Sequence, residues 1–332
     1  MTAWTPEALY EAYRAEEANY AEAARTYKTT LRRLLERGGV IDCSVKARAK
    51  SAVELYKKQR RKRYEDPWSE CPDLVGARIV VPTPGTMSAV VATLKASEEF
   101  STFEIEDQRE EAKPNEIRYL GLHVHLGATG VANSRGEPIQ CELQVRTIAQ
   151  DAWSVTDHRY VYKKPIDISD ELRRVFNRLL VLTELFDSEL QRGVEAVSKL
   201  ATFRCFELSR YLEATLTTLG PPPGDFESTF ETTQQLVEAN LGSPEELREL
   251  VVDYMEAHID DVEHVLGEIG PDSPAFDISN HWLTTQGEIL VLMALLDKDE
   301  YTLGNKLAGS DLYERLAPVA ATMDKTGYLA VS

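Results

Sequence analysis

The chain has 332 residues, of which 43% are hydrophobic, and a formal net charge of −18 at pH 7. This composition is typical of a globular protein that is long enough to form two domains. No apolar run reaches membrane-spanning length and the N-terminus lacks a signal-peptide pattern, so we expect a cytoplasmic protein without a membrane partner. The four cysteines stand singly, which favours reduced thiols over disulfides or a metal cluster.

The negative charge is concentrated in the second half of the chain. Residues 171–332 contain 12 Lys and Arg against 29 Asp and Glu, a net charge of −17, whereas residues 1–170 contain 25 against 26. Such an acidic region disfavours non-specific binding to nucleic acid. Most of the basic side chains that are available to bind anions therefore lie in the first half.

A long amphipathic helix is predicted near the N-terminus, over residues 5–37. Thr5 is a suitable N-cap, Pro6 fits the first turn, and a glycine pair that begins at Gly38 ends the pattern. A brief strand or turn is expected to follow and to lead to Ser44.

The densest basic segment comes next, over residues 46–63, with nine Lys and Arg and a single acid, Glu54. We expect a helix whose apolar side packs on the core while Arg48, Lys50 and Lys58 project elsewhere. Charge alone favours a solvated helix face. The alternative is a cradle for a polyphosphate, because closely grouped Lys and Arg side chains suit several phosphate oxygens.

A nearly uniform apolar run at residues 75–81 predicts an interior strand that is covered on both faces. Asp73 stands just before this strand, and Arg78 interrupts it. Because a buried arginine without an anionic partner is costly, Arg78 is expected to reach an edge or to meet a phosphate, a carboxylate or an aromatic ring.

Two further elements are expected before a hairpin. Residues 86–97 predict a helix capped by Thr86, and residues 101–107 predict a strand. The order of helix, helix, strand, helix, strand and hairpin indicates an α/β sandwich.

The hairpin is predicted from two alternating segments. From Tyr119 apolar and polar residues alternate, turn residues occupy positions 133–136, and a second alternation follows. If the two strands pair, their apolar faces must be buried together, so their polar residues also share one side. That side then carries Tyr119, His123, Glu142 and Gln144.

An ordered set of motifs in this half carries a family resemblance. In chain order the motifs are Arg48-x-Lys50 with Lys58, Asp73-Leu-Val-Gly-Ala-Arg78, Tyr119-x-Gly-x-His123, and Glu142-Leu-Gln-Val-Arg-Thr147 followed by Trp153 and His158. The set resembles the synthetase domain of RelA/SpoT-type alarmone synthetases over about residues 40–165. It is most similar to the small, single-function members, because nothing in the chain resembles the metal-dependent hydrolase domain of the long ones.

The resemblance implies a fold and an activity. The expected fold is α/β, with a nucleotidyltransferase-like mixed β-sheet flanked by helices in residues 1–165, followed by an acidic, mainly α-helical region in residues 166–332. The expected activity is that of a pyrophosphokinase, which transfers the β,γ-diphosphate of ATP to the 3′-hydroxyl of GDP or GTP. The products are (p)ppGpp and AMP, and the expected cofactor is Mg²⁺.

On the donor side, the resemblance assigns roles to four cations and one acid. Arg48 and Arg78 are expected to hold the adenine ring or the neighbouring phosphates, and Lys50 and Lys58 the triphosphate. Asp73 is expected to bind Mg²⁺. These residue types suit phosphoryl-type transfer, which depends on in-line positioning, a divalent cation and fixed positive charge.

On the acceptor side, Glu142 is expected to bind the same Mg²⁺ ion and to help deprotonate the attacking hydroxyl. By resemblance, Tyr119 stacks on the acceptor base and His123 touches the transferring phosphates. Gln144 and Arg146 support the acceptor pocket. One or two carboxylates with substrate phosphates are a sufficient ligand set for Mg²⁺.

The chain departs from the family pattern at the acceptor side and in the basic segment. Arg118 precedes the tyrosine and Leu120-Gly121 follow it, where the family usually has a glycine and a polar pair, and Glu54 replaces a serine. The altered tyrosine surroundings keep a second hypothesis open, a toxic relative that pyrophosphorylates the 3′ end of tRNA or an adenine nucleotide. A third hypothesis is a catalytically silent binding module.

The acidic half has helical periodicity in four segments, interrupted most clearly at Pro221-Pro222-Pro223-Gly224. The segments are residues 171–190, 194–219, 245–266 and 284–296. This half is expected to be a regulatory, oligomerising or neutralising module, so the partners to test are a second copy and an antitoxin-like protein.

Overall fold

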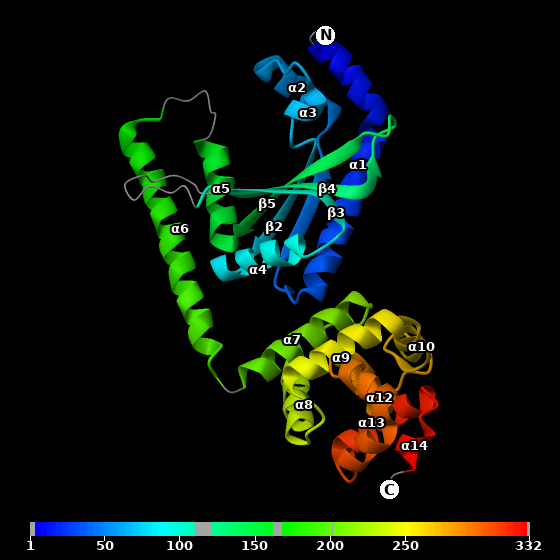
Figure 1. Cartoon of the computed structure of the whole chain (residues 1–332). Helices are drawn as coiled ribbons and strands as arrows, with labels where there is room; N and C mark the ends of the chain where they lie inside the picture. The colour runs from blue at the N-terminus through cyan, green and yellow to red at the C-terminus, as the bar shows by residue number, and fades with distance from the viewer. Residues whose placement is uncertain (1–3, 110–120, 162–167, 201, 331–332) are drawn as a thin grey trace. The chain divides into compact units, whose positions relative to one another are not determined.

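The computed structural model describes residues 4–109, 121–161, 168–200 and 202–330 (Figure 1). The chain divides into two compact units, Met1–Val194 and Glu195–Ser332. The sequence predicts a domain border at residue 165. Helix α6 (Asp170–Val197) starts beyond that position, and all but its last three residues belong to the first unit, where the Thr147 hydroxyl donates to Asp187 over 2.8 Å.

The first unit contains a five-stranded mixed sheet with the strand order β1-β2-β5-β4-β3. Strands β2 and β5 are parallel, and the other neighbouring strands are antiparallel. The predicted mixed sheet flanked by helices is therefore confirmed. Besides α6, its elements are α1 (Pro6–Arg37), β1 (Ser44–Ala49), α2 (Ala52–Lys62), α3 (Pro67–Glu70), β2 (Val75–Val81), α4 (Pro84–Lys95), β3 (Phe100–Asp107), β4 (Leu122–Ala132), β5 (Pro138–Thr147) and α5 (Ile148–Tyr160).

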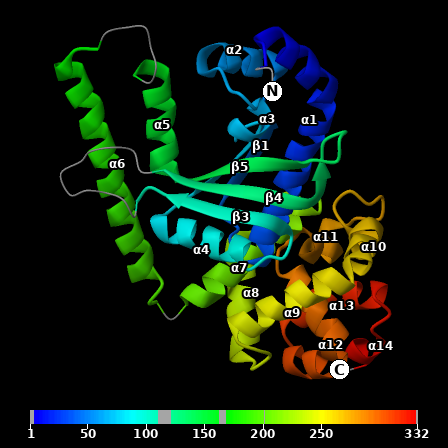
Figure 2. The ribbon, with the colours of Figure 1, turned by 45° about the horizontal axis from the view of Figure 1, so that its top comes forward.

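The two faces of this sheet differ sharply. On one face the side chains pack against α1 and α4 in the hydrophobic core, and Figure 2 shows α4 beneath the strands. The core-facing members of the three central strands are at most 5% exposed and include Val75, Ala77, Ile79, Val124, Leu126, Cys141, Leu143 and Val145. The alternate residues of the same strands form a polar face, as period-2 alternation requires.

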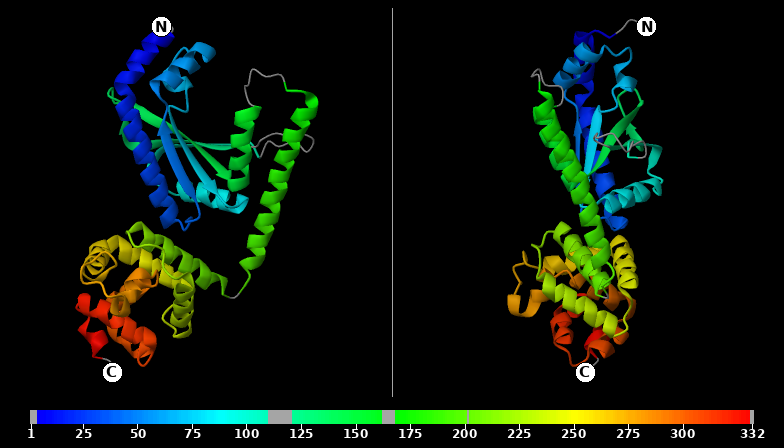
Figure 3. Two further views of the ribbon diagram at one scale, coloured as in Figure 1. Left: turned by 180° about the vertical axis from the view of Figure 1, so that it is seen from behind. Right: turned by 90° about the vertical axis from the view of Figure 1, so that its left-hand side faces the viewer.

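Helix α1 follows the core-facing side of the sheet, as Figure 3 shows from behind. Thr5 caps it, accepting from the amide of Ala8 at 3.2 Å, and Gly38 is its C-cap, so the predicted boundaries are confirmed. The buried Tyr27 hydroxyl donates to the carbonyls of Leu126 and Ile139 at 3.1 and 2.8 Å, and it accepts from the amide of Ala128 at 2.9 Å. This helix thus fixes β4 and β5 where they leave regular pairing.

Two local predictions in the first unit are wrong. The basic segment is not one helix, because its first residues form the edge strand β1 and α2 begins only after the N-cap Ser51. The alternation of Val45, Ala47 and Ala49 with basic residues was the signal for this strand. Helix α4 is capped by Thr83, whose hydroxyl accepts from the amide of Thr86 at 3.2 Å, because Pro84 can occupy the first turn.

Strand β2 is an interior strand, as predicted, but only one of its faces is fully covered. Its burial alternates along the strand, with Gly76, Arg78 and Val80 only partly buried. The apolar run therefore does not report two covered faces, since Gly76 and Val80 lie on the polar side of the sheet.

The second unit is entirely helical in the part of the chain that the structure describes. Its elements are α7 (Phe203–Thr218), α8 (Phe226–Glu238), α9 (Pro244–Ala257), α10 (Ile259–Ile269), α11 (Ile278–His281), a 3-10 helix η1 (Trp282–Thr285), α12 (Ile289–Leu307), α13 (Asp311–Thr322) and α14 (Thr326–Leu329). The predicted segment 245–266 is two helices that meet at His258, and the segment 194–219 is divided between α6 and α7.

The core of this second unit is built around the first turns of α12. Every residue from Ile289 to Leu296 is at most 4% exposed there.

Among the described residues, no helix in either unit is long and apolar enough to cross a membrane. The proline run between α7 and α8 ends the first of these helices, as the sequence predicted.

Candidate functional site

Strand register brings the predicted site residues of three strands onto the polar face. In the antiparallel pair β4–β5, His123 lies opposite Gln144. In the parallel pair β2–β5, Gly76 lies beside Glu142, and Arg78 beside Gln144. Because paired residues on neighbouring strands point to the same side of a sheet, the four polar side chains share one surface.

His123 and Glu142 are in direct contact on this face. The Nδ1 atom of His123 and the Oε1 atom of Glu142 are 2.9 Å apart, and the two side chains are only 21% and 14% exposed. A carboxylate held by a histidine in a largely dry place has a fixed orientation, which is what a proton acceptor in catalysis requires. The structure thus confirms that His123 and Glu142 lie on the same polar side of the hairpin, as predicted.

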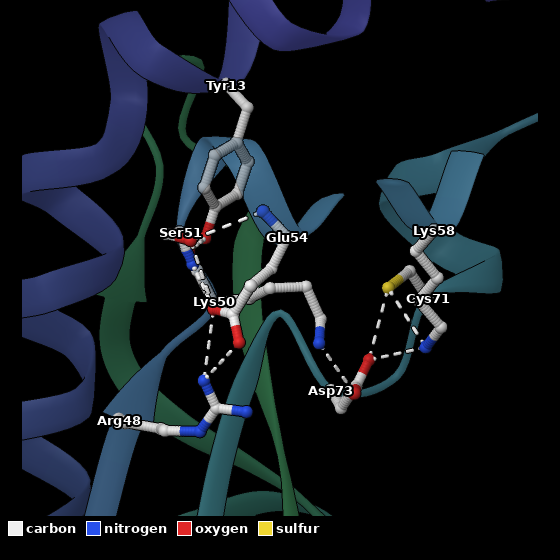
Figure 4. A network of polar contacts seen from close by, with 8 residues as sticks. All are labelled: Tyr13, Arg48, Lys50, Ser51, Glu54, Lys58, Cys71 and Asp73. Atoms are coloured by element: carbon white, nitrogen blue, oxygen red, sulfur yellow. Dashed lines mark hydrogen bonds and ion pairs between the residues drawn. The ribbon is translucent and has the colours of Figure 1, made fainter. Parts of the chain in front are cut away.

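A second cluster surrounds Asp73, just before β2 (Figure 4). Its Oδ2 atom is 2.8 Å from Nζ of Lys50, and its Oδ1 atom is 2.7 Å from Nζ of Lys58. Burial opposes ionisation of Asp73, but the hydrogen bonds from the two lysines outweigh burial and hold its pKa well below the usual range. Burial alone would lower the pKa of Lys58, yet the bond to Asp73 raises it. Asp73 and Lys58 are therefore ionised at neutral pH.

The backbone around Lys50 is fixed from two sides. Its amide donates to the carbonyl of Leu74 at 2.8 Å, and its carbonyl accepts from the Tyr13 hydroxyl at 2.7 Å. The Lys50 side chain is only 8% exposed, so the ammonium group is aimed at Asp73 by its surroundings. The Cys71 thiol donates to the same carboxylate at 3.2 Å, and burial raises the pKa of this thiol to about 11.

Arg48 contacts Glu54 at the start of α2 (Figure 4). Its Nη1 atom donates to both carboxylate oxygens, at 2.9 and 3.1 Å. Glu54 in turn accepts from the amide of Ser51 at 2.9 Å and completes a capping box at the start of α2. Burial opposes ionisation, but the bonds from Ser51 and Arg48 lower the pKa of Glu54 to about 2. Glu54 therefore caps α2 together with Ser51 and also forms an ion pair with Arg48.

Arg78 contacts a carboxylate, which is one of the partners that the sequence predicted for it. Its Nη1 atom is 2.9 Å from Oδ1 of Asp151, in the first turn of α5. Arg146 approaches the same carboxylate at 3.5 Å and donates to Gln144 at 2.7 Å and to Ser154 at 2.6 Å. Sequence reasoning missed Asp151, because nothing in the sequence indicates that the start of α5 lies over the polar face.

The predicted residues therefore form three groups, while Tyr119 lies outside the described residues. The first group holds Lys50, Lys58 and Asp73, the second holds His123 and Glu142, and the third joins Arg78, Gln144 and Arg146 through Asp151. Arg48 is at the rim, on the edge strand β1.

The two predicted magnesium ligands lie near the same part of the sheet. Glu142 is on β5 beside Gly76, and Asp73 is in the turn that leads into β2, three residues before Gly76. Two carboxylates with nearby lysines for phosphate match the way in which Mg²⁺ binds together with nucleotide phosphates. The donor set present here fits this ion.

One region of the chain matches a known protein family. Residues 47–167 match the family model described as the region found in RelA / SpoT proteins. The match covers the motifs that carry the family resemblance, and the resemblance is thereby confirmed. GTP pyrophosphokinase YwaC of Bacillus subtilis (strain 168) is 31% identical over 136 residues, which cover 39% of this chain and 64% of that relative. The chain thus matches less than two thirds of the length of this curated relative.

Two solved structures are similar over about half of the chain. Small alarmone synthetase 1 from Bacillus subtilis is 21% identical, with 55% of this chain and 96% of that chain covered and a TM-score of 0.45. A GTP pyrophosphokinase family protein from Streptococcus pneumoniae is 22% identical, with 55% and 92% covered and a TM-score of 0.47.

Proposed function

We propose that this protein is a pyrophosphokinase that transfers the β,γ-diphosphate of ATP to the 3′-hydroxyl of GDP or GTP, with Mg²⁺ as cofactor. The observation that carries the proposal is that two lysines hold Asp73 just before β2, while Glu142 lies on the polar face of the neighbouring strand β5. The RelA/SpoT region and the similarity to a GTP pyrophosphokinase support the same activity.

The Lys50–Asp73–Lys58 cluster is the proposed site of the triphosphate. Without nucleotide, the lysines neutralise Asp73 at distances of 2.8 and 2.7 Å. When the nucleotide binds, the two ammonium groups exchange this carboxylate for phosphate oxygens, and Asp73 becomes a ligand for the cation. No buried charge is left unpaired in either state, which avoids the large cost of an isolated buried ion. A Mg²⁺ ion held by Asp73 and Glu142 would neutralise charge on the transferring phosphates.

Arg48 and Arg78 are the proposed adenine-binding pair. Arg48 lies opposite Gly76 across β1 and β2, so Arg78 is its diagonal neighbour, at about 7–8 Å between Cα atoms. A planar ring with contacts of about 3.5 Å on each side fits such a gap. Gly76 has no side chain, and a Cβ atom there would meet nothing within 4 Å, so the surface over Gly76 is open.

Glu142 is the proposed general base. It accepts the proton of the acceptor 3′-hydroxyl while that oxygen forms a bond to the β-phosphorus of ATP, and the bond from this phosphorus to the α,β-bridging oxygen breaks. AMP leaves with the bridging oxygen. His123 fixes the Glu142 carboxylate from 2.9 Å and is the proposed contact of the transferring phosphates. Gln144 and Arg146 are the proposed supports of the acceptor pocket, and Tyr119 is its proposed stacking residue.

A second acceptor is favoured by one observation on α2. The helix ends in a run of exposed cations, Arg60, Arg61, Lys62 and Arg63, beside the proposed ATP-binding residue Lys58. Such a run suits the phosphate backbone of a nucleic acid. This favours the 3′ end of tRNA as the alternative acceptor, with an adenine nucleotide as a further one.

One experiment separates these functions. The full-length protein is incubated with γ-labelled ATP and Mg²⁺ in a mixture of GDP, GTP, adenine nucleotides and tRNA, and the labelled product is identified. We expect AMP together with a labelled 3′-diphosphorylated guanine nucleotide, and no label transfer by the Glu142→Gln control. Label on tRNA or on an adenine nucleotide supports the alternative. Absence of any transfer by the native protein contradicts both.

A further inference from the structure

Helix α1 contacts the junction between β1 and α2 through two side chains of one helix face. Tyr13 and Glu17 stand four residues apart, so they point to the same side of α1. The buried Tyr13 hydroxyl donates to the carbonyl of Lys50 at 2.7 Å (Figure 4). The Glu17 carboxylate accepts from the amide of Ala52 at 3.3 Å. One turn of α1 thus holds the chain on both sides of the N-cap Ser51, where it leaves the edge strand and enters the helix.

The Lys50 carbonyl depends on Tyr13 because water has little access to it. Lys50 as a whole is only 7% exposed, and its hydrogen bond with Tyr13 is buried. A buried carbonyl that loses its donor costs free energy, so without the hydroxyl the peptide group would rotate toward another partner. Such a rotation would move the Cα atom of Lys50 and, with it, the ammonium group that is 2.8 Å from Asp73.

The other end of α2 is held by the same N-terminal part of the chain. Gln59 is 3% exposed, and its Nε2 atom donates to the carbonyl of Trp4 at 2.9 Å. The Tyr56 hydroxyl donates to Glu7 at 3.1 Å. Lys58 lies between Tyr56 and Gln59 in the sequence, so its backbone is also fixed relative to α1.

We propose that Tyr13 and Glu17 are positioning residues for ATP, which act through Lys50. The inference rests on the proposed function, because it takes the ATP triphosphate as the ligand of Lys50 and Lys58. Lys50 directly follows β1 and Lys58 lies in α2, so the junction that α1 holds sets the separation of the two ammonium groups. A fixed separation matters because a misplacement of about 1 Å can lower a rate about a hundredfold.

The first test compares two tyrosines of α1 that each lose only a hydroxyl group. Calorimetry measures how the full-length protein binds an ATP analogue with a methylene group between its α and β phosphorus atoms. We expect Tyr13→Phe to weaken this binding about tenfold, as for one buried hydrogen bond, and to leave the KM for the acceptor unchanged.

Tyr27→Phe is the matched control. The Tyr27 hydroxyl also donates to buried backbone carbonyls, but these belong to Leu126 and Ile139 and not to the junction before α2. Both variants should lower the free energy of unfolding, and only Tyr13→Phe should lower the affinity for the analogue. Native affinity in Tyr13→Phe, or an equal loss of affinity in Tyr27→Phe, would overturn the proposal.

The second test asks whether Tyr13 acts through Lys50. In a Lys50→Met protein, the further change Tyr13→Phe should alter the affinity for the analogue by less than about twofold, because two residues that act in series are not additive. A second loss of about tenfold in the double variant would contradict this route.

Glu17 supplies a third test that leaves the core intact, because its side chain is only partly buried. Glu17→Ala should weaken binding of the analogue about threefold. Glu17→Gln should restore the native affinity, because its amide oxygen can still accept from Ala52. Equal affinities of Glu17→Ala and the native protein would contradict the role of Glu17.

The same measurements separate this inference from the proposed enzymatic activity. A native protein that binds the analogue but transfers no label contradicts the activity, while the differences in binding still decide the positioning role. A native protein that does not bind the analogue at all contradicts both.

Discussion

The two faces of the five-stranded sheet differ in role: one packs in the hydrophobic core, and the other carries the proposed site residues. In β5, Cys141 and Leu143 are fully buried in the core, while Glu142 between them lies on the polar face beside His123. Adjacent residues of one strand therefore have unrelated environments, because successive side chains point to opposite faces. A substitution on the polar face should change activity at nearly constant stability, and a substitution on the core face should do the reverse.

The largest expected effect is that of Glu142→Gln. The amide keeps the size of the side chain but cannot accept the proton, so kcat should fall by about 10³-fold. The melting temperature should change little, because Glu142 is outside the core. The control is Gln140→Ala, an exposed position two residues earlier on the same face. An unchanged kcat for Glu142→Gln would remove Glu142 from the proposed mechanism.

On the opposite face, Leu143→Ala should destabilise the first unit by about 2–5 kcal/mol, because Leu143 is 0% exposed and its removal leaves a cavity. Urea unfolding measures this loss. The folded fraction should retain its kcat and its KM values. A large loss of kcat at native-like stability would mean that the two faces are not separate in their effects.

Asp73→Asn tests the lysine cluster at the edge of the polar face. Activity should fall by about 10²-fold, because the proposed metal ligand is lost. In the absence of Mg²⁺, Asp73→Asn should instead bind an ATP analogue more tightly than the native protein does, because Lys50 and Lys58 no longer neutralise a carboxylate. The analogue carries a methylene group between its α and β phosphorus atoms. Calorimetry measures both conditions, and weaker binding in the absence of metal would contradict the proposed exchange of partners.

A smaller effect is expected at the rim, where Glu54 holds Arg48. Glu54→Gln keeps a capping-box residue at the start of α2 but removes the charge, so the KM for ATP should rise by about three- to fivefold with kcat unchanged. Ser51→Ala should lower stability by about 1 kcal/mol and leave the KM unchanged. If Glu54 acts through Arg48, Glu54→Gln has no further effect in an Arg48→Ala protein. A KM shift that persists there would show a separate role.

The smallest expected effect is on the pH dependence of stability, and it arises from the ion pairs of Asp73 with Lys50 and Lys58. The pKa of Asp73 is lower in the folded protein than its ordinary value of 3.8, because Lys50 and Lys58 outweigh burial. The stability from this carboxylate is therefore complete above that ordinary value and is lost as the pH falls through the folded pKa. The free energy of unfolding is measured in urea from about pH 5 to about pH 2.5, a range that spans the unperturbed carboxyl pKa values. It should fall less steeply with decreasing pH in Asp73→Asn than in the native protein.

Period-2 alternation was sufficient to predict which residues of β4 and β5 share the polar face. His123, Glu142 and Gln144 follow from the sequence in this way, since a hairpin with one buried face has a single acceptable register. Arg78 was predicted to need a partner, but the identity of that partner depends on the position of α5, which local sequence does not encode. The edge strand β1 was missed for another physical reason: its basic residues also suit a helix, and only its pairing with β2 decides between them.

The single Tyr27 hydroxyl has a consequence for how the protein matures. It joins α1 to backbone groups that lie 99 and 112 residues later in the chain. During synthesis this helix leaves the ribosome long before its partner strands exist, so its apolar side must wait unprotected. Contacts of such long sequence separation form late and slowly. The hairpin that bears His123 and Glu142 pairs over a short stretch of chain, so it is the docking of the first helix onto this hairpin, and not the hairpin itself, that requires a long loop to close.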